Sequence, residues 1–294
     1  MTRRLDVPVA GGTLAVFELG DGGEPVLAVH GITGNSRSWL AVARALDGQG
    51  SLLAVDLRGR GASSALPPPY GMEAYARDML AVLDHAGIER AVLVGHSLGA
   101  YAVARFAADH PSRVRAAVLV DGGLTLPEIE DVDDPEAFLQ AFLGPALARL
   151  ELTFADPEAY HDWWRAHPAF AGNDVADADL VAYADHDLAG DPPRLHSTVA
   201  KECVRADAAE LFEIGEPAHR LAVPVEMLRA PRGLQNQPEP MIPASLAAAW
   251  ESEDPGRRRV SEVPDVNHYT IVMGAAGAGA VAEAIVRALQ TPAG

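Results

Sequence analysis

Cysteine and lysine are nearly missing from this chain of 294 residues, since each occurs only once, as Cys203 and Lys201. A single thiol has no partner within the chain, so we expect no internal disulfide and a reducing, cytoplasmic environment. Long apolar runs are missing too, which argues against a membrane-spanning helix. Two arginines near the N-terminus are not followed by the apolar stretch of a secretory signal peptide, so none is expected.

Positive charge is also scarce. The chain has 23 lysines and arginines against 41 acidic residues, a formal net charge of −18. Such a surface repels nucleic acid and anionic lipid, so we expect neither a nucleic-acid nor a membrane partner. The expected partner is a small molecule. Whether the chain forms a homo-oligomer is left open by the sequence. The length allows one large domain, or one domain with a sizeable insertion.

Strand-like and helix-like segments alternate in the first part of the chain. An opening hairpin is expected over residues 5–18, and short apolar strands at 25–29, 51–55, 91–94 and 114–120. Helical patterns fill the intervals between these strands. The alternation predicts the α/β class, with a mostly parallel central sheet flanked by helices.

The alternation stops in the middle of the chain. No apolar strand is expected between residues 124 and 216, where the pattern is helical; the expected helices span residues 135–150, 157–167, 177–188 and 195–209. Strand patterns return at 224–229 and 258–263, and helices at 243–250 and 272–289. We therefore predict an α/β core formed by residues 1–123 and 217–294, with residues 124–216 inserted as a helical cap or lid.

One serine has the sequence context of a catalytic nucleophile. Gly95-His96-Ser97-Leu98-Gly99 directly follows an expected strand and directly precedes an expected helix. A strand, a sharp turn with one serine and a helix make up the nucleophile elbow of the G-x-S-x-G pattern. Gly95 and Gly99 are consistent with this turn, because a side chain at either position would clash where the strand and the helix approach each other. Ser97 is the predicted nucleophile.

Four motifs occur in an order that resembles the α/β-hydrolase fold family, in particular its serine-hydrolase branch with a helical cap. They are His30-Gly31, the glycine-rich loop from Asp56 to Ser63, the elbow at Ser97, and a late Asn267-His268. The resemblance covers residues 5–123 and 217–289. It implies that His268 is the general base, and that the backbone N–H groups of Ile32 and Leu98 form the oxyanion hole.

The third member of such a triad is an acid, and here the chain departs from the commoner family pattern. Many members carry an aspartate in the loop after the strand at 224–229, but residues 230–237 contain none, and Asn236 stands there instead. Some members take the acid from the end of the preceding core strand, where this chain has Asp121. We predict Asp121 as the acid, with Glu239 as the alternative.

A serine at the elbow favours acyl transfer to water. The prediction is a carboxylic-ester or lactone hydrolase (EC 3.1.1) for a small, mostly apolar substrate. One alternative is a hydrolase of carbon–carbon bonds beside a ketone, and another is a non-hydrolytic binding protein with an idle triad.

No cofactor and no metal are expected, and Asp185-His186-Asp187 is interpreted as a solvated charged face. The candidate pocket residues are His96, Phe138, Phe142, Trp163 and Trp164.

Overall fold

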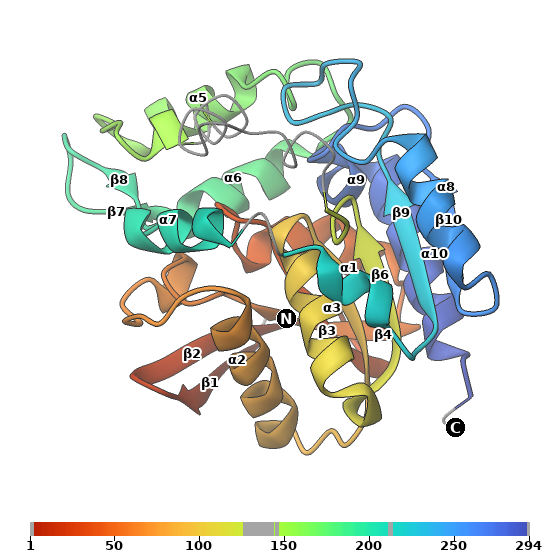
Figure 1. The fold of residues 1–294 in the computed structure, drawn as a ribbon. Coiled ribbons are helices and arrows are strands. Elements are labelled where there is room, and N and C mark those ends of the chain that lie inside the picture. The colour runs from red at the N-terminus through yellow and green to blue at the C-terminus, as the bar shows by residue number, and fades with distance from the viewer. Residues whose placement is uncertain (1–2, 126–143, 145–146, 211–213, 293–294) are drawn as a thin grey trace.

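An eight-stranded sheet organises the fold (Figure 1). The computed structural model describes residues 3–125, 144, 147–210 and 214–292. The strands are β1 (Arg3–Val9), β2 (Gly12–Leu19), β3 (Glu24–Val29), β4 (Gly50–Val55), β5 (Ala91–His96), β6 (Val114–Val120), β9 (Val225–Arg229) and β10 (Arg258–Glu262). Their order is β1-β2-β4-β3-β5-β6-β9-β10. The pairs β1–β2 and β2–β4 are antiparallel, and all other neighbours are parallel. The predicted α/β class is confirmed.

Helices cover both faces of the sheet because successive side chains of each strand point to opposite sides. In β5, Leu93 joins the core on one face, and Val92 and Val94 join the core on the other. The first face packs against α2 (Met72–His85), α3 (Leu98–Asp109) and α8 (Ala244–Glu253). The second packs against α1 (Leu40–Ala45) and α10 (Ala275–Leu289). Short 3-10 turns lie at Ser36–Trp39, Gly61–Ser63, Pro111–Arg113 and Glu216–Arg220.

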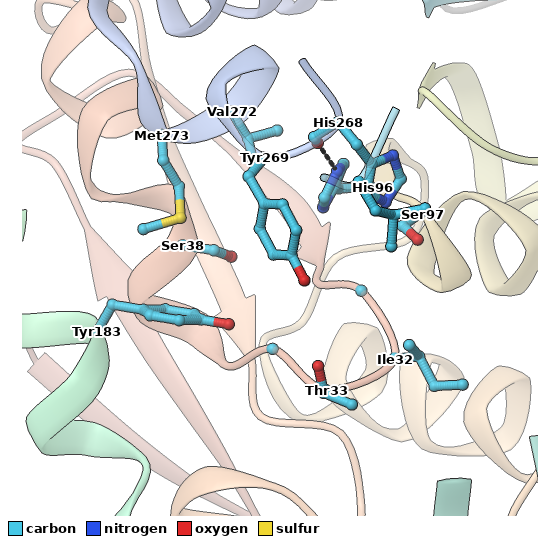
Figure 2. A pocket seen from close by; sticks show the side chains of 13 residues that line it. Ile32, Thr33, Ser38, His96, Ser97, Tyr183, His268, Tyr269, Val272 and Met273 are labelled. Carbon is cyan, nitrogen blue, oxygen red and sulfur yellow. Dashed lines mark hydrogen bonds between the residues drawn. The ribbon is translucent and has the colours of Figure 1, made fainter. Parts of the chain in front are cut away.

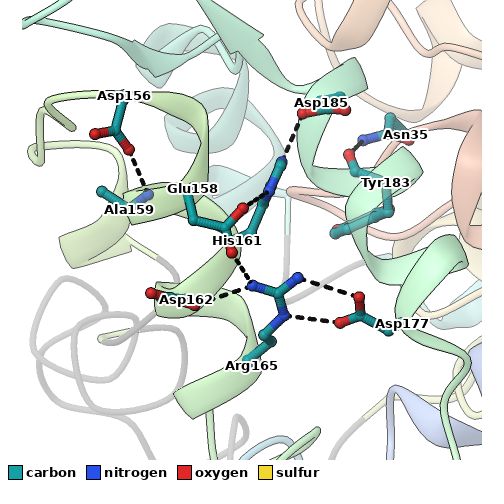
Figure 3. Close-up of polar contacts among 10 residues, drawn as sticks. All are labelled: Asn35, Asp156, Glu158, Ala159, His161, Asp162, Arg165, Asp177, Tyr183 and Asp185. Carbon is teal, nitrogen blue, oxygen red and sulfur yellow. Dashed lines mark hydrogen bonds and ion pairs between the residues drawn. The ribbon is translucent and has the colours of Figure 1, made fainter.

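A further helical layer lies over the loops at the carboxyl ends of the parallel strands (Figure 1). It contains α5 (Pro157–Ala166), α6 (Asp177–His186) and α7 (Lys201–Ala209). Ion pairs join α5 to α6: Arg165 Nε lies 2.7 Å from Asp177 Oδ1, and His161 Nε2 lies 2.7 Å from Asp185 Oδ1 (Figure 3). The layer belongs to the part of the chain in which helices were predicted.

Two contacts tie this layer to the loops of the sheet. The side-chain amide of Asn35 donates to the backbone carbonyl of Tyr183 at 3.0 Å (Figure 3). His186 Nε2 lies 2.6 Å from a carboxylate oxygen of Asp56, a residue with no exposed surface. Asn35 follows β3 and Asp56 follows β4, so α6 is fixed above the ends of these two strands.

The predicted helix at 195–209 is wrong in its first part. Instead, β8 (His196–Ser197) pairs with β7 (Leu188–Ala189), and the helix begins only at Lys201. The hydroxyls of Ser197 and Thr198 donate to the buried Asp187 carboxylate at 2.8 and 3.0 Å. These contacts hold the segment extended, and the sequence pattern does not reveal them.

The predicted helix at 272–289 is interrupted. The chain forms α9 (Thr270–Met273), then an extended residue at Gly274, then α10. Gly274 pairs with Val175 in an isolated bridge, which connects this corner to the helical layer. Most of the helix expected at 135–150 lies outside the described residues. Among the helices of the described ranges, none has the length and apolar character needed to cross a membrane.

Candidate active site

Ser97 occupies a strained turn between β5 and α3. Its φ and ψ are 53° and −122°, a backbone conformation that residues other than glycine rarely adopt. The turn requires glycines around it: a Cβ on Gly99 would lie 2.0 Å from the carbonyl oxygen of Val29. A Cβ on Gly95 would lie 2.1 Å from the carbonyl oxygen of Gly99. The predicted strand–turn–helix context of Ser97 is therefore present.

A histidine held by a buried carboxylate lies beside Ser97 (Figure 2). Nδ1 of His268 is 2.7 Å from Oδ2 of Asp121, and Asp121 Oδ1 accepts the N–H of Ala230 at 3.0 Å. Because an ionised carboxylate only accepts hydrogen bonds, Nδ1 carries the proton, and Nε2 of the neutral ring is left as an acceptor. Ser97 and His268 line the same cavity. The serine and the histidine–aspartate pair therefore border one space.

Of the two acids considered from the sequence, the structure places Asp121 beside His268. Asp121 directly follows β6 and has no exposed surface. Glu239 is exposed in the loop after β9. Asn236, at the place where other members have an aspartate, accepts instead from the side-chain amide of Asn267 at 3.3 Å.

Two backbone N–H groups lie beside the serine. A Cβ on Gly31 would be 3.1 Å from Cβ of Ser97 and 3.6 Å from its Oγ, so the loop that carries Ile32 passes directly by the side chain. Leu98 is the first residue of α3, where a helix leaves its N–H groups without internal partners. Within the described ranges, the N–H of Ile32 donates to no backbone carbonyl. Both groups are therefore available to a carbonyl oxygen bound at Ser97.

The orientation of the Ile32 N–H is set by His30. The Gly31 carbonyl accepts from His30 Nδ1 at 2.7 Å and from the N–H of Gly34 at 3.0 Å. His30 Nε2 accepts the N–H of Leu57 at 3.0 Å, which fixes the neutral tautomer. In a trans peptide the N–H points away from the carbonyl, so holding the Gly31 oxygen also aims the Ile32 N–H. Burial lowers the pKa of His30 to about 4, so its ring stays neutral.

Two buried guanidinium groups hold the next two carbonyls of this loop. Arg60 Nε donates to the carbonyl oxygen of Ile32 at 2.9 Å, and Arg149 Nη2 donates to that of Thr33 at 3.2 Å. Neither arginine has exposed surface, and each forms an ion pair with a buried aspartate. The Arg60 partner is Asp207 on α7. The loop beside Ser97 is therefore fixed by groups from separate parts of the chain.

His96, a predicted pocket residue, lines the cavity and also supports His268. Its Nε2 donates to the backbone carbonyl of His268 at 2.7 Å, and the two rings are 4.7 Å apart (Figure 2). Burial, and to a smaller extent the nearby His268 ring, hold the pKa of His96 well below its usual value. The ring is thus a neutral donor that fixes the backbone of the loop carrying His268.

The cavity at Ser97 is small. The space open to the centre of a water molecule is about 30 Å³. Its lining residues are Gly31, Ile32, Thr33, Gly34, Ser38, His96, Ser97, Tyr183, Leu234, His268, Tyr269, Val272 and Met273. The lining comes from the loop after β3, the elbow, α6, the loop after β9 and the segment before α10.

The aromatic residues expected to line the pocket do not line this cavity in the described part of the chain. Trp164 is buried behind Tyr183, with ring centroids 5.2 Å apart, and Trp163 is half-buried beside Trp164. Phe138 and Phe142 lie outside the described residues. The pair of tryptophans belongs to the core beneath α5 and α6 because Trp164 also packs on other buried rings of this layer.

Sequence reasoning missed the hydroxyl-bearing residues of the cavity. Thr33 and Ser38 follow the His30-Gly31 motif, and Tyr269 directly follows His268, so nearness to these motifs was the available signal. Tyr183 had no such signal, since it sits in the middle of α6.

The acidic segment around His186 is only partly the solvated face that was predicted. Asp187 is buried and pairs with Arg149, and His186 contacts Asp56. Asp185 is exposed, as expected. Within the described ranges, no group of histidine, cysteine and acidic side chains is arranged to hold a metal ion.

The fold and this site define a class: an α/β protein with a serine at a strained strand-to-helix turn and a histidine–aspartate pair beside it. The model of the alpha/beta hydrolase fold family matches residues 24–172, and the chain belongs to that family.

Relatives extend the comparison. RutD of Klebsiella pneumoniae (strain 342), named as a carbamate hydrolase, is 42% identical over 106 residues, or 35% of this chain and 40% of that protein. A protein of the same name from Caulobacter vibrioides (strain NA1000 / CB15N) is 34% identical over 218 residues, covering 68% of this chain and 78% of that one. The match thus spans less than half the length of the Klebsiella relative.

Among solved structures, E-2-(acetamidomethylene)succinate hydrolase superposes with a TM-score of 0.78 over 98% of both chains, at 24% identity. At this identity, the likeness concerns the fold.

The contact between Asp121 and His268 gives a first prediction. Asp121→Asn should lower kcat for an activated ester by about 10⁴-fold, because the histidine loses the carboxylate that fixes its tautomer. Glu239→Gln is the matched control, since Glu239 is exposed in the loop after β9, and it should change kcat little. Equal effects of the two substitutions on purified protein would contradict the assignment of the acid.

The depressed pKa of His30 gives a second prediction, on stability. The unfolded chain binds a proton on this imidazole below its ordinary pKa of 6.5, whereas the folded chain does so only near pH 4. The stability contributed by neutral His30 is therefore present above pH 6.5 and is lost as pH falls toward 4. The loss should reach about 3 kcal/mol.

Urea unfolding at pH 7 and at pH 4 measures this loss. His30→Asn keeps a donor for the Gly31 carbonyl but does not titrate in this range, so it should lose less stability between the two pH values than the wild type. The difference in the free energy of unfolding between pH 7 and pH 4 is taken within each protein. Any effect of the substitution on stability that does not depend on pH therefore cancels. The same loss in both proteins would show that His30 does not carry the effect.

Proposed function

We propose that this chain is a serine hydrolase that cleaves a carboxylic ester or lactone of a small substrate through an acyl-enzyme. The observation that carries the proposal is that Ser97, in its strained turn, shares one cavity with His268, whose Nδ1 is held by Asp121. Ser97 is the nucleophile, His268 the general base and Asp121 the acid that orients it.

In the first half of the proposed reaction, Ser97 Oγ attacks the substrate carbonyl carbon and its proton passes to His268 Nε2. The carbonyl oxygen becomes an oxyanion that accepts from the N–H groups of Ile32 and Leu98. These donors are fixed before the substrate arrives, so little reorganisation accompanies the development of charge. Collapse of the tetrahedral intermediate breaks the bond to the leaving group, which takes the proton from His268.

In the second half, water replaces the leaving group. His268 Nε2 accepts a proton from the water as its oxygen attacks the acyl carbon, and the same two N–H groups hold the new oxyanion. The bond to Ser97 then breaks, Oγ recovers its proton, and a carboxylic acid is released. All steps use groups of this chain, and Asp121 stabilises the imidazolium each time it forms.

Residues 124–216 act as the cap in this proposal, because α6 already supplies Tyr183 to the lining of the cavity. A second candidate substrate is a carbamate, which the names of the relatives favour. Its carbonyl would meet the same nucleophile and the same oxyanion donors. Cleavage of carbon–carbon bonds and an idle triad stay as alternatives for the test below. The cytoplasmic location and the small-molecule partner remain predictions.

Replacement of the serine tests the proposal. Ser97→Ala should lower hydrolysis of p-nitrophenyl acetate by about 10⁴-fold or more, because no other group takes over as the nucleophile. A fluorophosphonate probe should label the wild type and not this variant. Ser252→Ala, at an exposed serine of α8, is the matched control and should keep both activities. A folded wild type that neither hydrolyses esters nor reacts with the probe would sink the proposal in favour of the idle triad.

A further inference from the structure

Two kinds of side chain line the cavity beside Ser97. Besides Ser97, the hydroxyl-bearing ones are Thr33, Ser38, Tyr183 and Tyr269. The apolar ones are Ile32, Leu234, Val272 and Met273. Among the lining residues that the structure describes there is no aspartate, glutamate, lysine or arginine. The space therefore suits an uncharged group that carries a polar atom.

The hydroxyls of Tyr183 and Tyr269 point into the same space, toward Thr33 (Figure 2). In the described part of the chain, neither phenol forms a hydrogen bond, whereas Ser38 Oγ already donates to the carbonyl oxygen of Asn35 at 2.9 Å. Burial raises the pKa of both phenols, so both remain protonated donors. The cavity thus presents two hydroxyl donors that need an acceptor.

Both tyrosines are held rigidly. The Tyr183 backbone is tied to Asn35 at 3.0 Å, and its ring packs edge-on against Trp164 at 5.2 Å between centroids. The Tyr269 ring packs against Phe170 at 5.3 Å. Donors fixed by packing in this way recognise an acceptor with little loss of side-chain freedom.

The size of the cavity limits what can bind. A single water needs about 10–15 Å³ of space for its centre. The space of about 30 Å³ beside Ser97 therefore favours a short acyl group. A carboxylate would find no lysine or arginine among the lining residues in the described part of the chain.

We propose that this cavity selects substrates with a short, uncharged acyl group that carries a hydrogen-bond acceptor, such as an ether, amide or carbamate oxygen, received by the hydroxyls of Tyr183 and Tyr269. The inference rests on the proposed function, which it deepens by naming the class of acyl group. An apolar acyl group of the same size leaves both phenols without an acceptor, and a site built to form hydrogen bonds discriminates against such analogues.

Two esters of equal size test the proposal: p-nitrophenyl methoxyacetate and p-nitrophenyl butyrate, which differ by an ether oxygen in place of a methylene. After correction for their rates of alkaline hydrolysis, wild-type kcat/KM should favour the methoxyacetate by about tenfold or more. Tyr183→Phe and Tyr269→Phe should each lower the methoxyacetate-to-butyrate ratio by about fivefold to tenfold. The anionic p-nitrophenyl hydrogen succinate should be a poor substrate.

Tyr70→Phe, which removes a hydroxyl that donates to the Leu66 carbonyl and does not line the cavity, is the matched control and should leave the ratio unchanged. Fluorophosphonate labelling of Ser97 verifies that each variant retains a folded site. Hydrolysis of both esters with a ratio that neither cavity substitution changes would overturn this inference alone. Failure of the wild type to hydrolyse any ester or to react with the probe would overturn the proposed function, and the inference with it.

Discussion

A buried guanidinium must have a partner, and Arg60 finds its partners in three parts of the chain. Removing a charge from water costs several kcal/mol unless an opposite charge and hydrogen bonds compensate. Arg60 has no exposed surface, pairs with Asp207 of α7, and donates to the hydroxyl of Tyr75 on α2 at 2.6 Å. Its remaining Nε–H holds the carbonyl of Ile32. The loop that carries Ile32, the helix α2 and the helical layer are thus joined at one charged group.

Arg149, like Arg60, combines an ion pair to a buried aspartate with a hydrogen bond to a carbonyl of this loop. It pairs with Asp187 at the end of α6 and holds the carbonyl of Thr33, the residue after Ile32. Arg149 thus contacts both the loop that carries Ile32 and Thr33 and the end of α6, the helix that places Tyr183 at the cavity. The apolar core stabilises the sheet, but these buried ion pairs fix the site.

The parts of the fold that depend on local pattern could be predicted from the sequence. The apolar runs predict the strands. The sharp turn at Ser97 is predicted by its flanking glycines, where a side chain would clash with the backbone of the turn or of β3. The sequence alone could not decide between Asp121 and Glu239. The decision depends on which carboxylate lies next to His268, and this is set by the order of the strands and the course of the loops. Tyr183 was missed because its role depends on the hydrogen bond between its backbone carbonyl and Asn35, 148 positions away in the chain.

The position of Asp121, the proposed acid, at the end of β6 has a consequence for how this protein can change. Ser97 N–H donates to the Val120 carbonyl at 2.9 Å, and Asp121 N–H donates to the Leu228 carbonyl at 2.7 Å, so the sheet itself fixes the proposed nucleophile and the proposed acid. The loop at 230–240 carries no reacting group in the proposed mechanism and contributes Leu234 to the cavity lining, but its Ala230 N–H holds Asp121 and its Asn236 accepts from Asn267. Provided that these two contacts are kept, the rest of the loop can diverge during evolution, and a segment grafted there could reshape substrate preference while Ser97, His268 and Asp121 stay in place.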